Sequence, residues 1–242
     1  MKRRFAVVAA LALVLAGCGE DDGGADAEPA GSMTAPSSPT TSSSGGALPG
    51  ERVETHPYQG ARLAVVGVAA DDKLKVRSGP GVEFGVLFEL GPLAMNAVAT
   101  GHNRSVGNGG FWSEITAVDR TGWANTAFLL QPGQVTDVTA ALFPTPSARP
   151  KADSMSELGQ VVARRRASAA DPASNIVVVD GPTVGDLGEV TVDVIGLGDD
   201  AQGGERLKIF AEPGPPGARF TVRTVEATAL CSRGVTMDGL CV

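Results

Sequence analysis

The chain has 242 residues, a formal net charge of −7 and a hydrophobic fraction of 43%. This length allows one or two domains with buried cores. Proteins that bind nucleic acid need a basic surface, so the acidic balance argues against a nucleic-acid partner. The chain also has just two histidines and three cysteines, which narrows the options for metal binding and nucleophilic catalysis.

Residues 1–17 are typical of an export signal. Met1–Arg4 is positively charged, and an apolar run covers Phe5–Leu15. That run is far shorter than the ~20 residues of a membrane-spanning helix. Its end, Leu15-Ala16-Gly17-Cys18, resembles the bacterial lipobox. The resemblance implies cleavage before Cys18, fatty acyl chains such as palmitate on this residue, and a lipid anchor on the extracytoplasmic face of the cell membrane. A chance cysteine beside an ordinary cleavage site is the alternative.

Residues 18–50 contain almost no large apolar side chains. Acidic residues come first, and Ser, Thr, Pro and Gly follow. A segment of this composition cannot bury enough apolar surface to offset the entropy lost on ordering. We therefore expect a disordered linker that acts as a spacer between membrane and folded protein.

Residues 51–135 read as short strands separated by turns. Leu74–Arg77 alternates apolar and polar side chains, which is the period of a half-buried strand. Ser78–Gly81 contains two glycines and a proline, which favour a sharp reversal. Phe84–Leu90 supplies another strand, and Asn108-Gly109-Gly110 is typical of a hairpin turn. Several short strands at this spacing predict a small barrel or sandwich.

Three motifs in this region resemble bacterial SH3-like domains. Leu74–Gly81 (LKVRSGPG) is similar to the family's opening motif, Phe111–Ile115 (FWSEI) to its central strand, and Thr121–Leu129 (TGWANTAFL) to its closing motif. The chain departs from the pattern at Phe111, where the family has Gly, and at Phe128, where it has Tyr.

The resemblance implies a small, partly open β-barrel that binds peptidoglycan, particularly its peptide portion. Its ligand groove would include Trp112, Trp123 and Asn125. Each tryptophan could equally be a core or groove-wall residue that never touches the ligand.

Residues 136–152 form a predicted second linker, rich in proline, and residues 153–242 a second domain. Ser154 and Glu157 fit a capping box at the start of a helix. Arg164–Arg166 would end that helix as a solvated cationic group, or contact an anionic polymer. The rest alternates as an antiparallel meander, with a change of parity that predicts a bulge near Arg223.

Charged residues on the meander are expected on a solvated sheet face. Arg206 and Lys208 alternate with Leu207 and Ile209, which face the other side. Asp193 and Glu226 would make cross-strand pairs on the polar face, together with Arg219 and Arg223. Binding of an anionic ligand by this set is the alternative.

Cys231 and Cys241 remain once Cys18 carries lipid, and an oxidising compartment favours a disulfide between them. A catalytic thiol would need a histidine, and neither His56 nor His102 lies near them in the sequence. The two histidines also lack partners at metal-ligand spacing, so we expect no metal and no cofactor.

The expected fold is mainly β: a small SH3-like barrel followed by an α+β domain with one helix on an antiparallel meander. The expected function is that of a membrane-anchored, non-catalytic envelope lipoprotein that binds peptidoglycan or a wall-associated partner. A protein–protein adaptor or sensory lipoprotein is the alternative, and a cell-wall hydrolase ranks last because no catalytic residues can be identified.

Overall fold

The computed structural model describes residues 47–107, 110–167, 173–183, 188–215 and 219–242. The predicted export signal, Cys18, most of the predicted linker 18–50 and the first two residues of the predicted 108–110 turn lie outside these ranges. None of the helices in the described ranges is long and apolar enough to cross a membrane.

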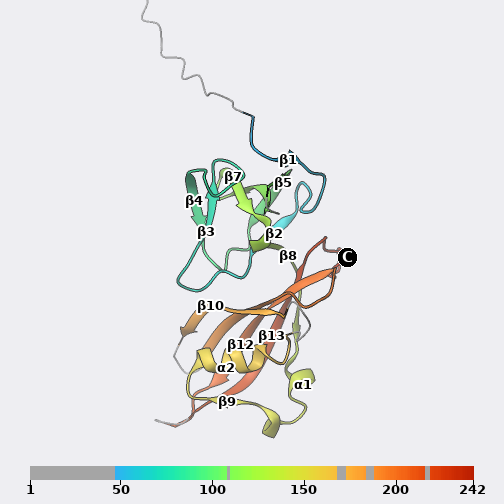
Figure 1. Cartoon of the computed structure of the whole chain (residues 1–242). Coiled ribbons are helices and arrows are strands. Elements are labelled where there is room, and N and C mark those ends of the chain that lie inside the picture. The colour runs from blue at the N-terminus through green and yellow to red at the C-terminus, as the bar shows by residue number, and fades with distance from the viewer. Residues whose placement is uncertain (1–46, 108–109, 168–172, 184–187, 216–218) are drawn as a thin grey trace, which may run out of the picture. The chain divides into compact units, whose positions relative to one another are not determined.

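The prediction of a mainly β protein is confirmed. The described residues contain one antiparallel sheet of 13 strands, in the order β10-β11-β12-β13-β8-β2-β5-β6-β7-β3-β4, with β1 on β5 and β9 on β13 (Figure 1). This path is open, with β10 and β4 at its ends, so the strand pairing of the described residues shows no closed barrel. The strands are β1 Glu51–Arg52, β2 Arg62–Val65, β3 Leu74–Arg77, β4 Val86–Leu90, β5 Ala97–Val106, β6 Gly110–Ala117, β7 Arg120–Asn125, β8 Leu129–Asp137, β9 Lys151–Ala152, β10 Asn175–Thr183, β11 Gly188–Ile195, β12 Gln202–Glu212 and β13 Phe220–Cys231.

Strands β2 to β7 and the start of β8 surround an apolar core of their own. In β3, Leu74 and Val76 are buried and Lys75 is exposed, as the alternation predicts. Gly122 of β7 is required at the point where that strand passes β3, because a Cβ there would lie 2.9 Å from the Arg77 carbonyl oxygen. Close packing against β3 therefore explains why the Thr121–Leu129 motif has a glycine at this position.

Strand β8 runs from the N-terminal strands into the C-terminal ones without a break. Its first residues pair with β2, in the register Val65↔Leu129 and Ala64↔Leu130. From Gln131 to Asp137 it pairs with β13. The strand thus crosses the position at which the sequence predicts a linker to begin. Beyond it lie α1 (Thr139–Leu142), the 3-10 helix η2 (Pro146–Ala148) and β9; a further 3-10 turn, η1 (Thr126–Phe128), precedes it.

Helix α2 (Met155–Ala163) packs on one face of the meander β10–β13 (Figure 1). The predicted cap is confirmed, since the Ser154 hydroxyl accepts the Glu157 amide at 3.2 Å. The Glu157 carboxylate reaches back to the amide of Asp153. Leu158 and Val162 of the helix share a fully buried core with Leu207 and Ile209 of β12, among others.

The predicted bulge is also confirmed. Phe210 pairs with Thr224 and Ala211 with Val222, which leaves Arg223 as the extra residue of β13. Bulges bend the strand and redirect the side chain at that point.

The prediction of a solvated polar face is wrong for Arg206, which is only 5% exposed. Its guanidinium forms a bidentate ion pair with Asp193, with Nε–Oδ1 and Nη2–Oδ2 distances of 2.7 and 2.9 Å. Nη2 also donates to the carbonyls of Val65 and Pro92, and Asp193 accepts the amide of Gly67. The N-terminal strands and their loops cover this face, so the pair is buried between two parts of the chain.

The helix end is not fully solvated either. The guanidinium of Arg166 pairs with Glu205, with 2.7 Å between Nε and Oε2, and this contact raises the pKa of Arg166. Arg165 lies over the ring of Phe143. These contacts depend on which strand ends beside the helix. Local sequence spacing does not show this, so the contacts could not be predicted from it.

Candidate functional site

A groove in the N-terminal strands contains two of the three residues predicted to bind ligand. Trp112 and Asn125 line a cavity of about 480 Å³, together with Phe128 and the cations Lys73, Lys75 and Arg77. We call this cavity the Trp112 groove. Its volume is within the range of sites that bind small molecules or peptide segments.

The sheet register explains why Trp112 and Asn125 meet. They are direct cross-strand partners on β6 and β7, so their side chains leave the same face. The Asn125 side chain also caps η1 by accepting the amide of Ala127 at 2.9 Å. Trp112 is just 5% exposed. It therefore forms the wall of the groove, while Phe128 is the more exposed aromatic side chain.

Trp123, the third predicted residue, does not line the Trp112 groove. It is buried on β7 opposite Glu114 of β6 and Arg77 of β3. The structure therefore brings Trp112 and Asn125 together in the groove. Trp123 shares their face of the sheet but is buried and is not among the residues that line the groove.

The rim of the Trp112 groove is cationic although the protein as a whole is acidic. Lys73 and Lys75 are exposed, and Asp72 is the acidic residue among those lining the cavity. Lys73 lies 3.8 Å from Glu89, a separation at which two exposed charges interact weakly. Arg77 is held in place because its Nη1 donates to the Phe84 carbonyl at 2.7 Å. The rim thus presents donors to an acidic ligand.

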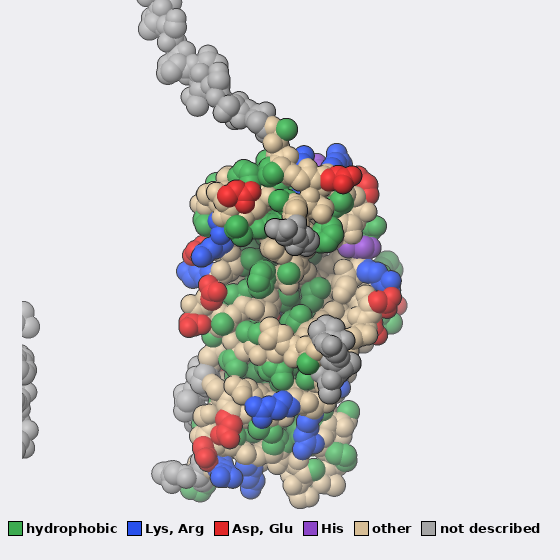
Figure 2. All heavy atoms as spheres, in the orientation of Figure 1, with side chains coloured by type: hydrophobic (Ala, Val, Ile, Leu, Met, Phe, Trp, Pro, Cys, Tyr) green, Lys and Arg blue, Asp and Glu red, His purple; other side chains and the backbone are tan. Residues whose placement is uncertain are grey.

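Apolar surface adjoins these cations. Val82, at the mouth of the groove, is 75% exposed. Val177 of β10 also lines the groove, which no local motif could have indicated because it belongs to the C-terminal meander. On the face shown in Figure 2, hydrophobic side chains gather across the middle and charged ones lie mostly nearer the edges.

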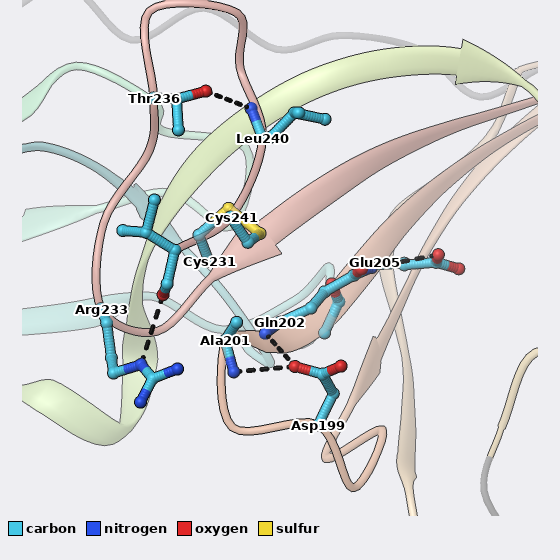
Figure 3. Close-up of a disulfide and its surroundings, with 11 residues drawn as sticks. Asp199, Ala201, Gln202, Glu205, Cys231, Arg233, Thr236, Leu240 and Cys241 are labelled. Atoms are coloured by element: carbon cyan, nitrogen blue, oxygen red, sulfur yellow. Dashed lines mark hydrogen bonds between the residues drawn. A yellow bond between two sulfur atoms is a disulfide. The ribbon is translucent and has the colours of Figure 1, made fainter.

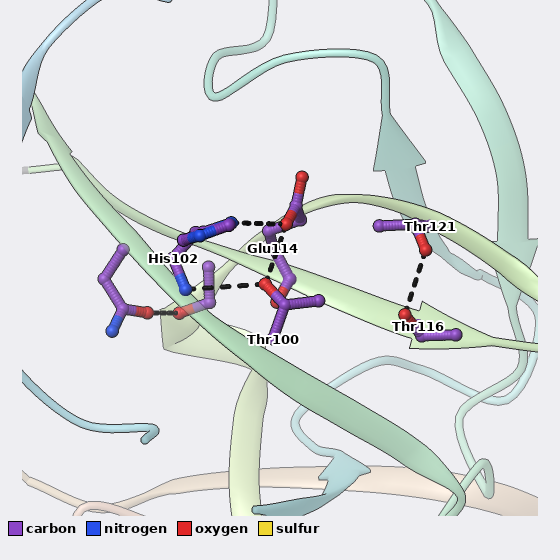
Figure 4. Close-up of polar contacts among 7 residues, drawn as sticks. Thr100, His102, Glu114, Thr116 and Thr121 are labelled. Carbon is purple, nitrogen blue, oxygen red and sulfur yellow. Dashed lines mark hydrogen bonds and ion pairs between the residues drawn. The ribbon is translucent and has the colours of Figure 1, made fainter. Parts of the chain in front are cut away.

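A polar cluster on β5 and β6 gives His102 a partner (Figure 4). The Glu114 carboxylate Oε2 lies 2.8 Å from His102 Nδ1 and accepts the Thr100 hydroxyl at 2.8 Å. The Thr100 hydroxyl also accepts the backbone amide of His102 at 3.4 Å, so Thr100 hydrogen-bonds to both other members of the cluster. The described residues contain no group of three or more side chains suited to holding a metal ion.

The expected disulfide joins Cys231 and Cys241 (Figure 3). The loop that it closes lies along β8, where the Gln134 amide donates to the Gly239 carbonyl at 2.8 Å. His56, distant in sequence, lines the same cavity of about 390 Å³ as Cys231. The sulfur of Cys231 is nevertheless bonded and buried, so the pair does not form a thiol–imidazole site.

No family model, curated protein or solved structure was found to match this chain. Its function must therefore be inferred from its own residues.

Proposed function

We propose that this chain is a membrane-anchored, non-catalytic envelope lipoprotein whose Trp112 groove binds peptidoglycan or a wall-associated partner. The observation that carries the proposal is the groove itself, in which a cationic rim adjoins Trp112 and Phe128. Short peptides with free carboxylates combine the acidic and apolar groups that such a surface would bind.

The SH3-like reading of residues 51–135 belongs to the same proposal. It is supported by the order in which the three motifs occur and by the position of two of them. Leu74–Arg77 and the segment from Trp123 to Phe128 lie on adjacent strands or turns around the groove. The lipid anchor is supported by Leu15-Ala16-Gly17-Cys18 at the end of an apolar run.

Retention of the protein by purified sacculi tests groove binding. We would compare the full chain in detergent with Lys73→Gln/Lys75→Gln, which removes two exposed cations from the rim without opening a core. Retention should fall several-fold. The control Lys151→Gln/Arg219→Gln removes two exposed cations elsewhere and should bind like the parent. Equal retention of the two double variants would contradict the assignment to the groove.

The anchor is tested separately by Cys18→Ser, which should release the protein into the medium. A variant that stays in the membrane fraction after a high-salt wash would contradict the lipid anchor and leave the groove assignment untouched.

An adaptor lipoprotein is the second candidate, favoured by the exposed apolar residues Val82, Val86 and Leu87 near the groove. Membrane anchoring without any retention by sacculi would support it. Clearing of cell-wall substrate in a zymogram would instead support the hydrolase alternative.

A further inference from the structure

A second cavity, with no lining residue in common with the Trp112 groove, lies beside the bulge of β13. It has a volume of about 520 Å³ and is bounded by the end of β8, α1, the segment through η2, and β13. Arg149 and Arg223 enter it from different segments, with Asp137 as the third charged residue. We call it the Arg149 cavity.

Arg149 lacks the partners that a half-buried guanidinium normally has. Its Nε is buried and makes no hydrogen bond. Among the described residues, no side-chain hydrogen bond or ion pair involving this guanidinium is found. An unpaired buried donor costs stability, and the cost is greater for a charged group. A free guanidinium fork in a cavity is therefore suited to a ligand that supplies acceptors.

Arg223 supplies a second cation because of the bulge. It is the extra residue between Val222 and Thr224, and its side chain is exposed. Its ion pair with Glu212 is long, at 3.9 Å, and both side chains are largely exposed. Such a pair contributes little stability, so it does not compete strongly with a ligand in the cavity.

Asp137 sets the charge that the cavity accepts. Its Oδ1 accepts the amide of Thr139 at 2.8 Å. Hydrogen bonds from the side chain and backbone of Thr139, and then the charge of Arg149, lower the pKa of Asp137. The carboxylate therefore stays ionised at neutral pH. Two arginines and one aspartate leave the cavity with one net positive charge, which matches a monoanion better than a dianion.

We propose that the Arg149 cavity binds a carboxylate, with the Arg149 guanidinium donating the hydrogen bonds and Arg223 providing the second positive charge. Phe143 and Pro144 on the cavity wall would contact the apolar part of the acid. This site goes beyond the proposed groove function and does not depend on it.

The test uses the full chain in detergent and follows the Arg149 Nε–H signal by ¹H–¹⁵N NMR during titration with acetate or inorganic phosphate. Acetate should shift the signal saturably, and phosphate should bind more weakly because Asp137 repels its second charge. Arg149→Gln should weaken acetate binding by about tenfold or more. Because this variant lacks the Arg149 signal, its binding is measured on the signals of other residues that line the cavity. Arg219→Gln, which removes an exposed arginine that pairs with Asp153, should leave it unchanged.

Stability gives an independent readout. Because the side chain of Arg149 makes no hydrogen bond among the described residues, Arg149→Met should leave the denaturant midpoint unchanged or raise it. A clear fall in that midpoint would assign Arg149 a structural role and overturn the proposal. So would an Arg149 signal that neither anion shifts, or equal acetate binding by Arg149→Gln. Tighter binding of phosphate than of acetate would overturn the assignment to carboxylates.

Discussion

The two faces of strand β12 are held by different forces. Leu207 and Ile209 point toward α2 and pack into a fully buried apolar core. Arg206, which immediately precedes Leu207 in the sequence, points the other way. It is also buried, but through an ion pair and hydrogen bonds to backbone carbonyls. Apolar packing is non-directional and accepts many neighbours, whereas a buried charge is stable only when each partner is in place.

The comparison predicts that removing one partner on the polar face destabilises the protein more than shortening one side chain on the apolar face. Asp193→Ala should lower the free energy of unfolding by about 4 kcal/mol, because it leaves Arg206 buried without its counter-charge. Chemical denaturation measures the loss. The control Asp193→Leu/Arg206→Met removes both charges and also the buried, unpaired Nη1, so it should cost much less. A double variant that is as unstable as Asp193→Ala would show that the two faces do not differ in this way.

The apolar face provides the matching measurement. Leu207→Ala should cost about 3 kcal/mol, from lost burial and from the cavity left beneath α2. The same denaturation experiment measures it, and Leu207→Met, which keeps the volume, should cost less than half as much. A loss below that of the methionine variant would mean that this core collapses around the missing side chain.

Removing the cap of α2 has the smallest expected effect. It tests how much the cap of the helix that covers the apolar face contributes to the free energy of unfolding. Ser154→Ala should cost about 1 kcal/mol, because the Glu157 amide loses its acceptor. Ser156→Ala, two residues further along the chain and without a cap hydrogen bond, is the control and should be close to neutral. If both variants were equally stable, the cap would not contribute to holding the helix.

Features set by short spacing could be predicted from the sequence. The cap at Ser154, the alternation in β3 and the bulge at Arg223 each depend on residues a few positions apart. The features that could not be predicted join distant segments. The Arg206–Val65 hydrogen bond spans 141 positions and the Gly67–Asp193 hydrogen bond 126, so no local pattern shows that the polar face is covered.

The candidate sites divide in the same way. Trp112 and Asn125 could be identified from motifs on neighbouring strands, whereas Val177 enters the groove from the other end of the sheet order. The Arg149 cavity depends on a segment after β8 and on the direction in which a bulge turns one side chain. The sequence spacing predicted the bulge, but it did not predict which side chains would lie beside Arg223 in the folded protein.

The unbroken path of β8 has a consequence for anyone who expresses half of this protein. A truncation after residue 135 would keep most of β8 but remove β13, the neighbour that satisfies its main-chain hydrogen bonds from Gln131 onward. It would also strip the carbonyls of Val65 and Pro92 of their guanidinium donor. Such a fragment would present an open strand edge and be prone to aggregate, so its failure to bind a ligand would say nothing about the intact chain.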